Sequence, residues 1–226
     1  MHIASDTDGQ IRPVIVPLGD AALLVRFADT LSDGANSAAI SFARALAETP
    51  LPGVLEVVPN LVSVLLRYDP ARVQLSLLTG ELRLRLYRTG NAPLPAAAHH
   101  TIAVRFGGEQ GPDLEAAAAA LGMGVDAFIA AHNATPLRVL ATGFAPGFVY
   151  CGFHPAGLIL PRRPIVRASV PAGAILFAAG QTAISATPAP TGWHFIGATP
   201  FLNFDPTATP PTTLRAGDSI RFEALA

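Results

Sequence analysis

The stretch Leu160–Thr182, LPRRPIVRASVPAGAILFAAGQT, carries the clearest pattern in the second half of the chain. Two short apolar runs, Ile165–Val170 and Ala174–Ala179, lie on either side of a Pro171–Gly173 turn. Short apolar runs that alternate with Pro/Gly turns are typical of strands in a β-barrel or β-sandwich. The stretch therefore predicts an all-β region.

The same alternation continues on both sides of this stretch. Turns at Pro188–Gly192 and Arg215–Asp218 separate further apolar runs. These runs predict strands at Arg138–Thr142, Thr182–Thr187, Trp193–Ala198 and Ser219–Ala224. Upstream, the sequence predicts a strand at Thr101–Phe106 and two short helices, Pro112–Leu121 and Val125–His132.

The first part of the chain has a different pattern. Apolar residues three or four apart predict two helices, one through Ala39, Phe42, Ala43 and Leu46 and one opened by Asp69–Pro70 and continued by Leu75, Leu78, Leu82 and Leu86. The end of the second helix, ELRLRL, also alternates like a strand. Strands are predicted at Ile11–Pro17, Ala21–Phe27, Gly53–Val58 and Leu61–Tyr68. The order ββαββα predicts an α+β sandwich with both helices on one face of an antiparallel sheet.

A segment without apolar periodicity, Thr89–His100, separates the two patterns. We therefore expect an α+β domain at residues 11–90 and a β-rich domain at residues 100–226.

The composition excludes several classes of protein. The 226 residues carry a formal net charge of −1 and contain 15 arginines but no lysine. A Schiff-base lysine, a biotin-carrying lysine and a lysine-containing phosphate loop are therefore excluded. The balanced charge argues against nucleic-acid binding, and no apolar run reaches the roughly 20 residues of a membrane-spanning helix. The polar N-terminus does not resemble a signal peptide, so we expect a cytoplasmic protein.

Three segments of the β-rich half contain candidate binding residues. They are Gly143–Phe148, the proline-flanked stretch with Arg162, Arg163 and Arg167, and the Gln181-Thr182 pair. Each alone is typical of a turn or a solvated charge, but their concentration favours a binding cleft. Arginine suits carboxylates and phosphates because its guanidinium forms two parallel hydrogen bonds. The histidines lack metal-site spacing, and the single Cys151 is interpreted as a packing residue rather than a nucleophile.

Motifs along nearly the whole chain resemble one known family. GFAPGF, LPRRPIVRASVPAG, AGQT, TGW, IGATP, FDP and LRAGDSIRF occur in the order found in the family that contains the 5-oxoprolinase subunit PxpB, the kinase inhibitor KipI and allophanate hydrolase subunit 1. The first half contributes GDAALLVRF, PGVLEVVPNLVSVLLRYDP and RFGGEQGPDLEAAAAALGM. This family is related to one half of the carboxyltransferase domain of urea carboxylase.

The resemblance implies a cyclophilin-like β-barrel after the α+β domain. It also implies two partners, a PxpC/KipA-like subunit (allophanate hydrolase subunit 2) and a LamB/YcsF-like subunit. The expected complex hydrolyses ATP to open the lactam ring of 5-oxoproline, giving glutamate. We expect ATP at the level of the complex, and no biotin attached to this lysine-free chain.

Matching the family motifs position by position also implies site residues. His132, Arg167 and Gln181 are the implied catalytic residues. Arg167 or Arg162 would hold a carboxylate or phosphoryl oxygen, Gln181 would stabilise an oxyanion, and His132 would act as acid or base. The implied substrate-binding residues are Phe144, Pro146, Gly147, Phe148, Arg162, Pro171, Gly173, Gly180, Thr182 and Trp193. No metal site is implied.

The chain departs from the family pattern at several positions, which leaves the substrate open. Ala183 replaces a glycine, Ser185 replaces a tyrosine, APTGW replaces SPGGW, and Tyr150-Cys151-Gly152-Phe153 replaces YLGG. Two alternatives therefore stand beside the 5-oxoprolinase subunit. One is a carboxyltransferase half-domain of a biotin-dependent urea or amide carboxylase, and the other is a KipI-like inhibitor of a histidine kinase.

Overall fold

The computed structural model describes residues 12–89 and 97–225. The chain divides into two compact units, Met1–Pro95 and Ala96–Ala226. The predicted strand start at Ile11 and most of the predicted segment between the domains lie outside the described residues.

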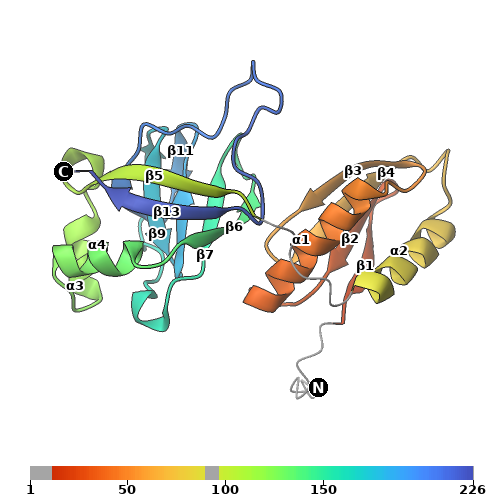
Figure 1. Ribbon diagram of the computed structural model, residues 1–226, viewed down its shortest axis with the longest axis horizontal. Helices are drawn as coiled ribbons and strands as arrows, with labels where there is room; N and C mark the ends of the chain where they lie inside the picture. Colours follow the sequence, from red (N-terminus) through yellow and green to blue (C-terminus); the bar gives the residue numbers. More distant parts are fainter. Residues whose placement is uncertain (1–11, 90–96, 226) are drawn as a thin grey trace. The chain divides into compact units, whose positions relative to one another are not determined.

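The first unit is a four-stranded antiparallel sheet with α1 and α2 on one face (Figure 1). Its strand order is β1-β2-β4-β3. The elements are β1 (Val14–Leu18), β2 (Ala22–Arg26), α1 (Asp33–Glu48), β3 (Val54–Pro59), β4 (Ser63–Tyr68) and α2 (Leu75–Thr89). Leu23, Val64 and Leu66 of the sheet and Phe42 and Leu82 of the helices form the buried core. The predicted ββαββα sandwich is confirmed.

The two helices begin in different ways. The Ser32 side chain accepts a hydrogen bond from the Ala35 N–H at 3.2 Å, which caps α1. The prediction that Asp69–Pro70 opens the second helix is wrong, because α2 begins at Leu75. Asp69 instead closes a turn, in which its carboxylate accepts the Ala71 N–H at 2.9 Å and its carbonyl accepts the Arg72 N–H at 3.0 Å.

The second unit is a closed seven-stranded barrel in the order β10-β7-β6-β13-β5-β12-β9. Its pairs are antiparallel except β13 with β5, which run parallel. The barrel strands are β5 (His99–Phe106), β6 (Leu137–Thr142), β7 (Val149–Gly152), β9 (Ala174–Ala178), β10 (Gln181–Ile184), β12 (His194–Ala198) and β13 (Ser219–Ala224). A separate ribbon pairs β8 (Arg167–Val170) with β11 (Ala189–Thr191). The remaining elements are η1 (Gly108–Gln110), α3 (Leu114–Ala120), α4 (Val125–Asn133) and η2 (Ala156–Leu158).

The barrel domain thus has the predicted β-barrel architecture with two short helices. Among the described helices, none alone is long and apolar enough to cross a membrane. Together α3 and α4 meet that test by length and composition only, with an 86° bend between them.

Side chains of the barrel form two apolar clusters on opposite faces of the strands. Inside the barrel, Phe177, Val139 and Ile184 pack with Phe128 of α4. On the outer surface, Phe148, Leu176, Trp193 and other residues form a second, smaller cluster. This outer cluster underlies the candidate site.

Candidate functional site

The outer surface of β7 and β10 carries several polar residues of interest. Because side chains alternate along a strand, Thr182 and Ile184 of β10 point into the barrel, while Gln181 and Ala183 point outward. Tyr150 of β7 pairs with Ala183. Tyr150 and Gln181 therefore lie on the same outer surface of adjacent strands.

Four aromatic rings form a row on this surface. Successive ring centroids from Phe144 to Phe148, Tyr150 and Trp193 are 5.5, 4.9 and 5.9 Å apart. Phe148 and Trp193 are buried, whereas Phe144 at the end of the row is 72% exposed. The row is an apolar wall with one open end, which suits a small flat ligand.

Arg162 supplies a positive charge next to this row. Its Cζ lies 5.9 Å from the centre of the Trp193 ring, and its exposed side chain forms no ion pair with a described residue. Burial raises the pKa of Tyr150, and the Arg162 charge offsets this only in part. Tyr150 is therefore a neutral hydroxyl donor at pH 7, and the Arg162 guanidinium is free to bind a carboxylate.

Gln181 has an unsatisfied amide group. Its Oε1 is buried and has no hydrogen-bond partner among the described residues. A Cβ at neighbouring Gly152 would lie 3.6 Å from Gln181 Cγ and 2.7 Å from Leu140 Cδ1, so a side chain there would require Leu140 to shift. An unpartnered buried amide oxygen is costly, and an N–H donor from a ligand would satisfy it.

Arg167 is already paired within the chain. Its Nη2 donates to Asp113 Oδ1 at 2.8 Å, and Arg163 Nη1 lies 3.4 Å from Asp113 Oδ2. Asp113 Oδ2 also accepts the Phe195 N–H at 2.8 Å. The carboxylate therefore joins the start of α3 to β8 and β12, and Arg167 is less available to a ligand than Arg162.

His132 and Thr182 lie inside the barrel rather than on its outer surface. The Thr182 hydroxyl is 2.8 Å from His132 Nε2 and 2.8 Å from His154 Nε2. Asn133 Oδ1, an acceptor, is 2.7 Å from His132 Nδ1. His132 Nδ1 therefore carries the proton, the Thr182 hydroxyl donates to His132 Nε2, and His154 Nε2 donates to Thr182.

Burial keeps both histidines neutral. It lowers the pKa of His132 to about 4, against a weaker opposite effect of the Asn133 hydrogen bond. Burial and then the neighbouring His132 lower the pKa of His154 to about 3. Burial also raises the pKa of the Cys151 thiol far above its usual range, so this buried cysteine is a packing residue, as predicted.

The glycines and prolines of the predicted site form turns. Gly147, Gly173 and Gly180 have φ angles of +71°, +79° and +70°. A methyl group at Gly147 would collide with Phe204 and Ala186, and one at Gly173 would collide with the Thr199 carbonyl oxygen. Pro146 and Pro171 each precede one of these glycines by one or two positions. These residues shape the loops around the outer surface.

The departures from the family pattern leave the strand regular. Ala183 has an ordinary strand conformation and is fully buried in the outer cluster. Its methyl group therefore fills space below the candidate site without straining the backbone. Ser185 donates a short hydrogen bond to the Thr187 carbonyl.

Sequence reasoning missed Tyr150, His154 and Asp113. Tyr150 lies in a four-residue strand that the preceding Pro146–Gly147 turn obscured, although its alternation with Val149 and Cys151 is a usable signal. Asp113 lies at the start of α3 but makes no side-chain cap there. No sequence pattern predicts its hydrogen bonds to Arg167 and Phe195, which lie 54 and 82 positions further along the chain.

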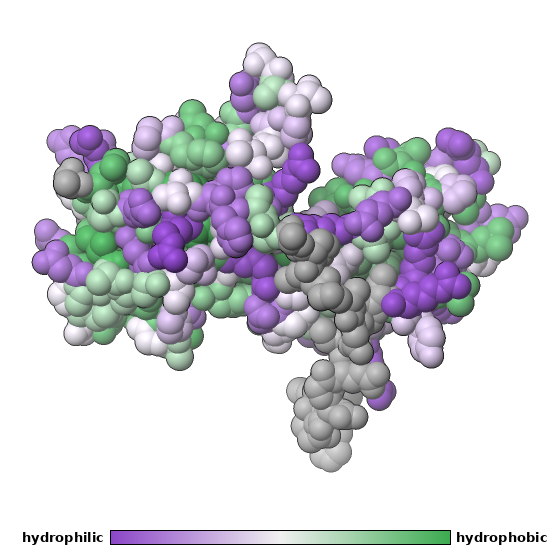
Figure 2. Space-filling model, in the orientation of Figure 1, coloured by the Kyte–Doolittle hydropathy of each residue, from purple (hydrophilic) through white to green (hydrophobic). Residues whose placement is uncertain are grey.

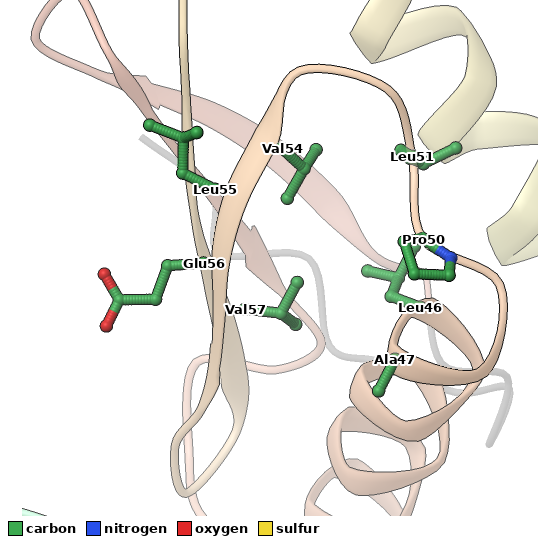
Figure 3. A pocket seen from close by; sticks show the side chains of 8 residues that line it. All are labelled: Leu46, Ala47, Pro50, Leu51, Val54, Leu55, Glu56 and Val57. Carbon is green, nitrogen blue, oxygen red and sulfur yellow. The ribbon is translucent and has the colours of Figure 1, made fainter.

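Two open grooves lie elsewhere on the described surface. One, of about 460 Å³, borders the Pro171 turn and β12 and includes Arg105 and Glu109. The other, of about 280 Å³, lies in the first unit between the end of α1 and β3 (Figure 3). The second groove is apolar, with Leu46, Leu51 and Val54 in its wall.

Comparison with known proteins identifies relatives of the whole chain. The 5-oxoprolinase B subunit of Bacillus subtilis is 33% identical over 94% of this chain and 92% of that protein. The protein of the same name from Escherichia coli O157:H7 is 36% identical over 76% of this chain and 78% of that protein.

Several solved structures are also similar to most of this chain. TTHA0988 is 35% identical with a TM-score of 0.79 over 91% of this chain, which spans only 40% of that longer protein. PH0987 from Pyrococcus horikoshii is 33% identical with a TM-score of 0.55, covering 94% of this chain and 97% of that one. Urea carboxylase of Kluyveromyces lactis shares the fold, with a TM-score of 0.74 at 12% identity. The match covers 99% of this chain and 23% of that one.

The family model described as carboxyltransferase domain, subdomain C and D, matches residues 13–214. With relatives above 30% identity along most of its length, the chain belongs to this carboxyltransferase-domain family, which includes the 5-oxoprolinase B subunits.

Proposed function

We propose that this chain is the B-type subunit of a cytoplasmic, ATP-dependent 5-oxoprolinase that opens the lactam ring of 5-oxoproline to give glutamate. The observation that carries the proposal is the relative from Bacillus subtilis, which bears this subunit name and aligns with 94% of the chain. That alignment includes both units and every candidate site residue of the barrel.

The outer surface has groups that complement each polar part of 5-oxoproline. Arg162 binds the carboxylate, with Trp193 beneath the guanidinium. The buried Gln181 Oε1 accepts the lactam N–H once a local movement admits the substrate. The neutral Tyr150 hydroxyl donates to the lactam oxygen and stabilises the negative charge that develops there during ring opening.

We assign His132, Thr182 and Arg167 to positioning rather than chemistry. His132 is buried inside the barrel, neutral at pH 7, and bonded to Thr182, the residue next to Gln181. Arg167 is bonded to Asp113. Both therefore act on the substrate only through the strands that they hold in place.

ATP enters only at the level of the complex. The chain has no lysine, so it lacks a lysine-containing phosphate loop. Biotin likewise cannot be attached to it, because the attachment requires a lysine.

The complex requires partner subunits. We expect a C-type subunit similar to PxpC or KipA and a LamB/YcsF-like subunit. The 40% coverage of TTHA0988 supports this, since a region like this chain is there part of a longer polypeptide.

Reconstitution tests the proposal. The chain is coexpressed with the C-type and LamB/YcsF-like subunits of its genome, and glutamate release from 5-oxoproline is measured with and without ATP. We expect release that needs ATP and this chain. An assembled complex that does not turn over 5-oxoproline would contradict the proposal.

The family description favours one alternative, a carboxyltransferase half-domain acting on urea or an amide. This alternative requires a biotinylated partner. In the same reconstitution, activity that avidin abolishes and that consumes bicarbonate would support the carboxyltransferase and contradict the 5-oxoprolinase.

A further inference from the structure

Helix α2 is apolar on two faces. Its inward face buries Leu78 and Leu82 in the core of the first unit, while Leu77, Leu84 and Tyr87 on its outward face are 68%, 57% and 90% exposed. The neighbouring α1 exposes no large apolar side chain. Apolar residues interrupt the hydrophilic surface of both units (Figure 2).

The outward residues form a regular stripe. Leu77, Gly80, Leu84 and Tyr87 are separated by steps of three, four and three residues. This is the spacing with which one helix packs along another. We call Leu77, Gly80, Leu84 and Tyr87 the α2 stripe.

Among the described residues, none outside α2 packs against Gly80. A methyl group there would meet no heavy atom within 4 Å outside the helix's own turns, and the φ angle is an ordinary helical one. Glycine destabilises a helix interior relative to alanine, so its presence needs another reason. A small residue in the middle of an apolar stripe lets the backbone of a second helix approach closely.

The charges beside the α2 stripe are positive. Arg83 and Arg88 are exposed and form no ion pair with a described residue. The single carboxylate of α2, Glu81, lies 3.3 Å from Arg85. Two copies packed through this face would bring arginines together, which disfavours self-pairing and favours an occupant with acidic side chains.

We propose that the α2 stripe is the docking surface for a helix of the C-type partner subunit, one that has small or apolar residues along its contact face and carboxylates on either side. This inference rests on the proposed function, which supplies the partner. The helix-in-groove mode fits the spacing of Leu77, Leu84 and Tyr87 as anchors around the close approach at Gly80.

The substitution Gly80→Ala is expected to change partner binding and folding stability in opposite directions. The substitution raises the Tm of the isolated chain by about 2–4 °C, because alanine is the better helix former. It weakens binding of the C-type subunit at least tenfold in calorimetric titration, because the methyl group blocks close approach. A variant that is more stable but binds less well cannot be explained by misfolding.

Two further variants test the anchors and the charges. Leu84→Glu weakens binding at least tenfold, and Arg83→Glu with Arg88→Glu weakens it and reduces its salt dependence. The control is Leu55→Glu, since Leu55 is 51% exposed on β3 and points away from the α1 side of the sheet (Figure 3). Leu55→Glu binds like the unchanged chain.

Three results would overturn the docking proposal. Unchanged binding by Gly80→Ala and Leu84→Glu would overturn it while leaving the proposed function intact. A dimer of the isolated chain that Leu84→Glu dissociates would assign the stripe to a second copy. Failure of the unchanged chain to bind the C-type subunit at all would overturn both proposals.

Discussion

Gly173 and Gly180 both have positive φ angles, but only Gly173 lies against another backbone segment. A methyl group at Gly180 would make an ordinary 3.5 Å contact with Ile159 Cγ1, whereas one at Gly173 would collide with the Thr199 carbonyl oxygen. We therefore predict that Gly180→Ala costs about 1–2 kcal/mol through its backbone conformation alone. Gly173→Ala should cost at least about 2 kcal/mol more, because the collision adds to the same backbone strain. Urea unfolding of the two variants measures the difference. Equal losses of unfolding free energy would contradict the close contact between Gly173 and the Thr199 carbonyl.

The buried histidine pair should make stability depend on pH. Because burial lowers the folded-state pKa of His132 to about 4 and of His154 to about 3, the unfolded chain binds more protons below pH 6.5. The contribution of the two histidines to stability is therefore nearly constant above about pH 7 and is lost progressively as the pH falls from there toward 4. Between pH 7 and 5 the expected loss is roughly 2 kcal/mol per histidine.

His154→Leu provides the matched variant for this pH dependence. It removes one of the two titrating groups, so unfolding measured at pH 7 and 5 should lose roughly half as much free energy as in the unchanged chain. A variant whose loss equals that of the unchanged chain would rule out His154 as a source of the pH dependence.

At the scale of the elements, the Asp113 carboxylate joins three of them. Its ion pair with Arg167 and its bond to the Phe195 N–H connect α3 with β8 and β12. We predict a coupling of about 1–2 kcal/mol between Asp113→Ala and Arg167→Ala in a double-mutant cycle of unfolding free energies. If the two substitutions change the unfolding free energy additively, Arg167 is not held by Asp113 and is available to the substrate.

The sequence predicted helices and strands best where the residue pattern fitted only one type of secondary structure. The helical stripe Ala39–Leu46 and the strand Ser219–Ala224 are confirmed. Strands β7 and β11 were missed because they have four and three residues, and only pairing with distant strands makes them strands. The alternating ELRLRL segment is helical because Leu82 and Leu86 pack against the sheet, and tertiary contact decides such cases.

At the scale of the whole molecule, the sequence singled out candidate segments but did not show on which side of a strand their residues lie. Of these segments, Phe148 lies in the aromatic row that continues through Tyr150 to Trp193, and Arg162 lies over the Trp193 ring. Which side of a strand a residue occupies depends on register, and a shift of one residue exchanges the two sides. Thr182 and Gln181 are adjacent in sequence, yet one bonds the buried histidines and the other faces outward.

We propose that Arg162 binds the substrate carboxylate on the outer surface. Steady-state kinetics of ATP-dependent glutamate release by the reconstituted complex tests it most directly. Arg162→Ala should raise the KM for 5-oxoproline at least tenfold in a complex that assembles normally, because a charge-assisted hydrogen bond is lost. The exposed Arg221→Ala serves as control and should leave KM unchanged. An unaltered KM in the intact Arg162→Ala complex would show that Arg162 does not bind the substrate carboxylate.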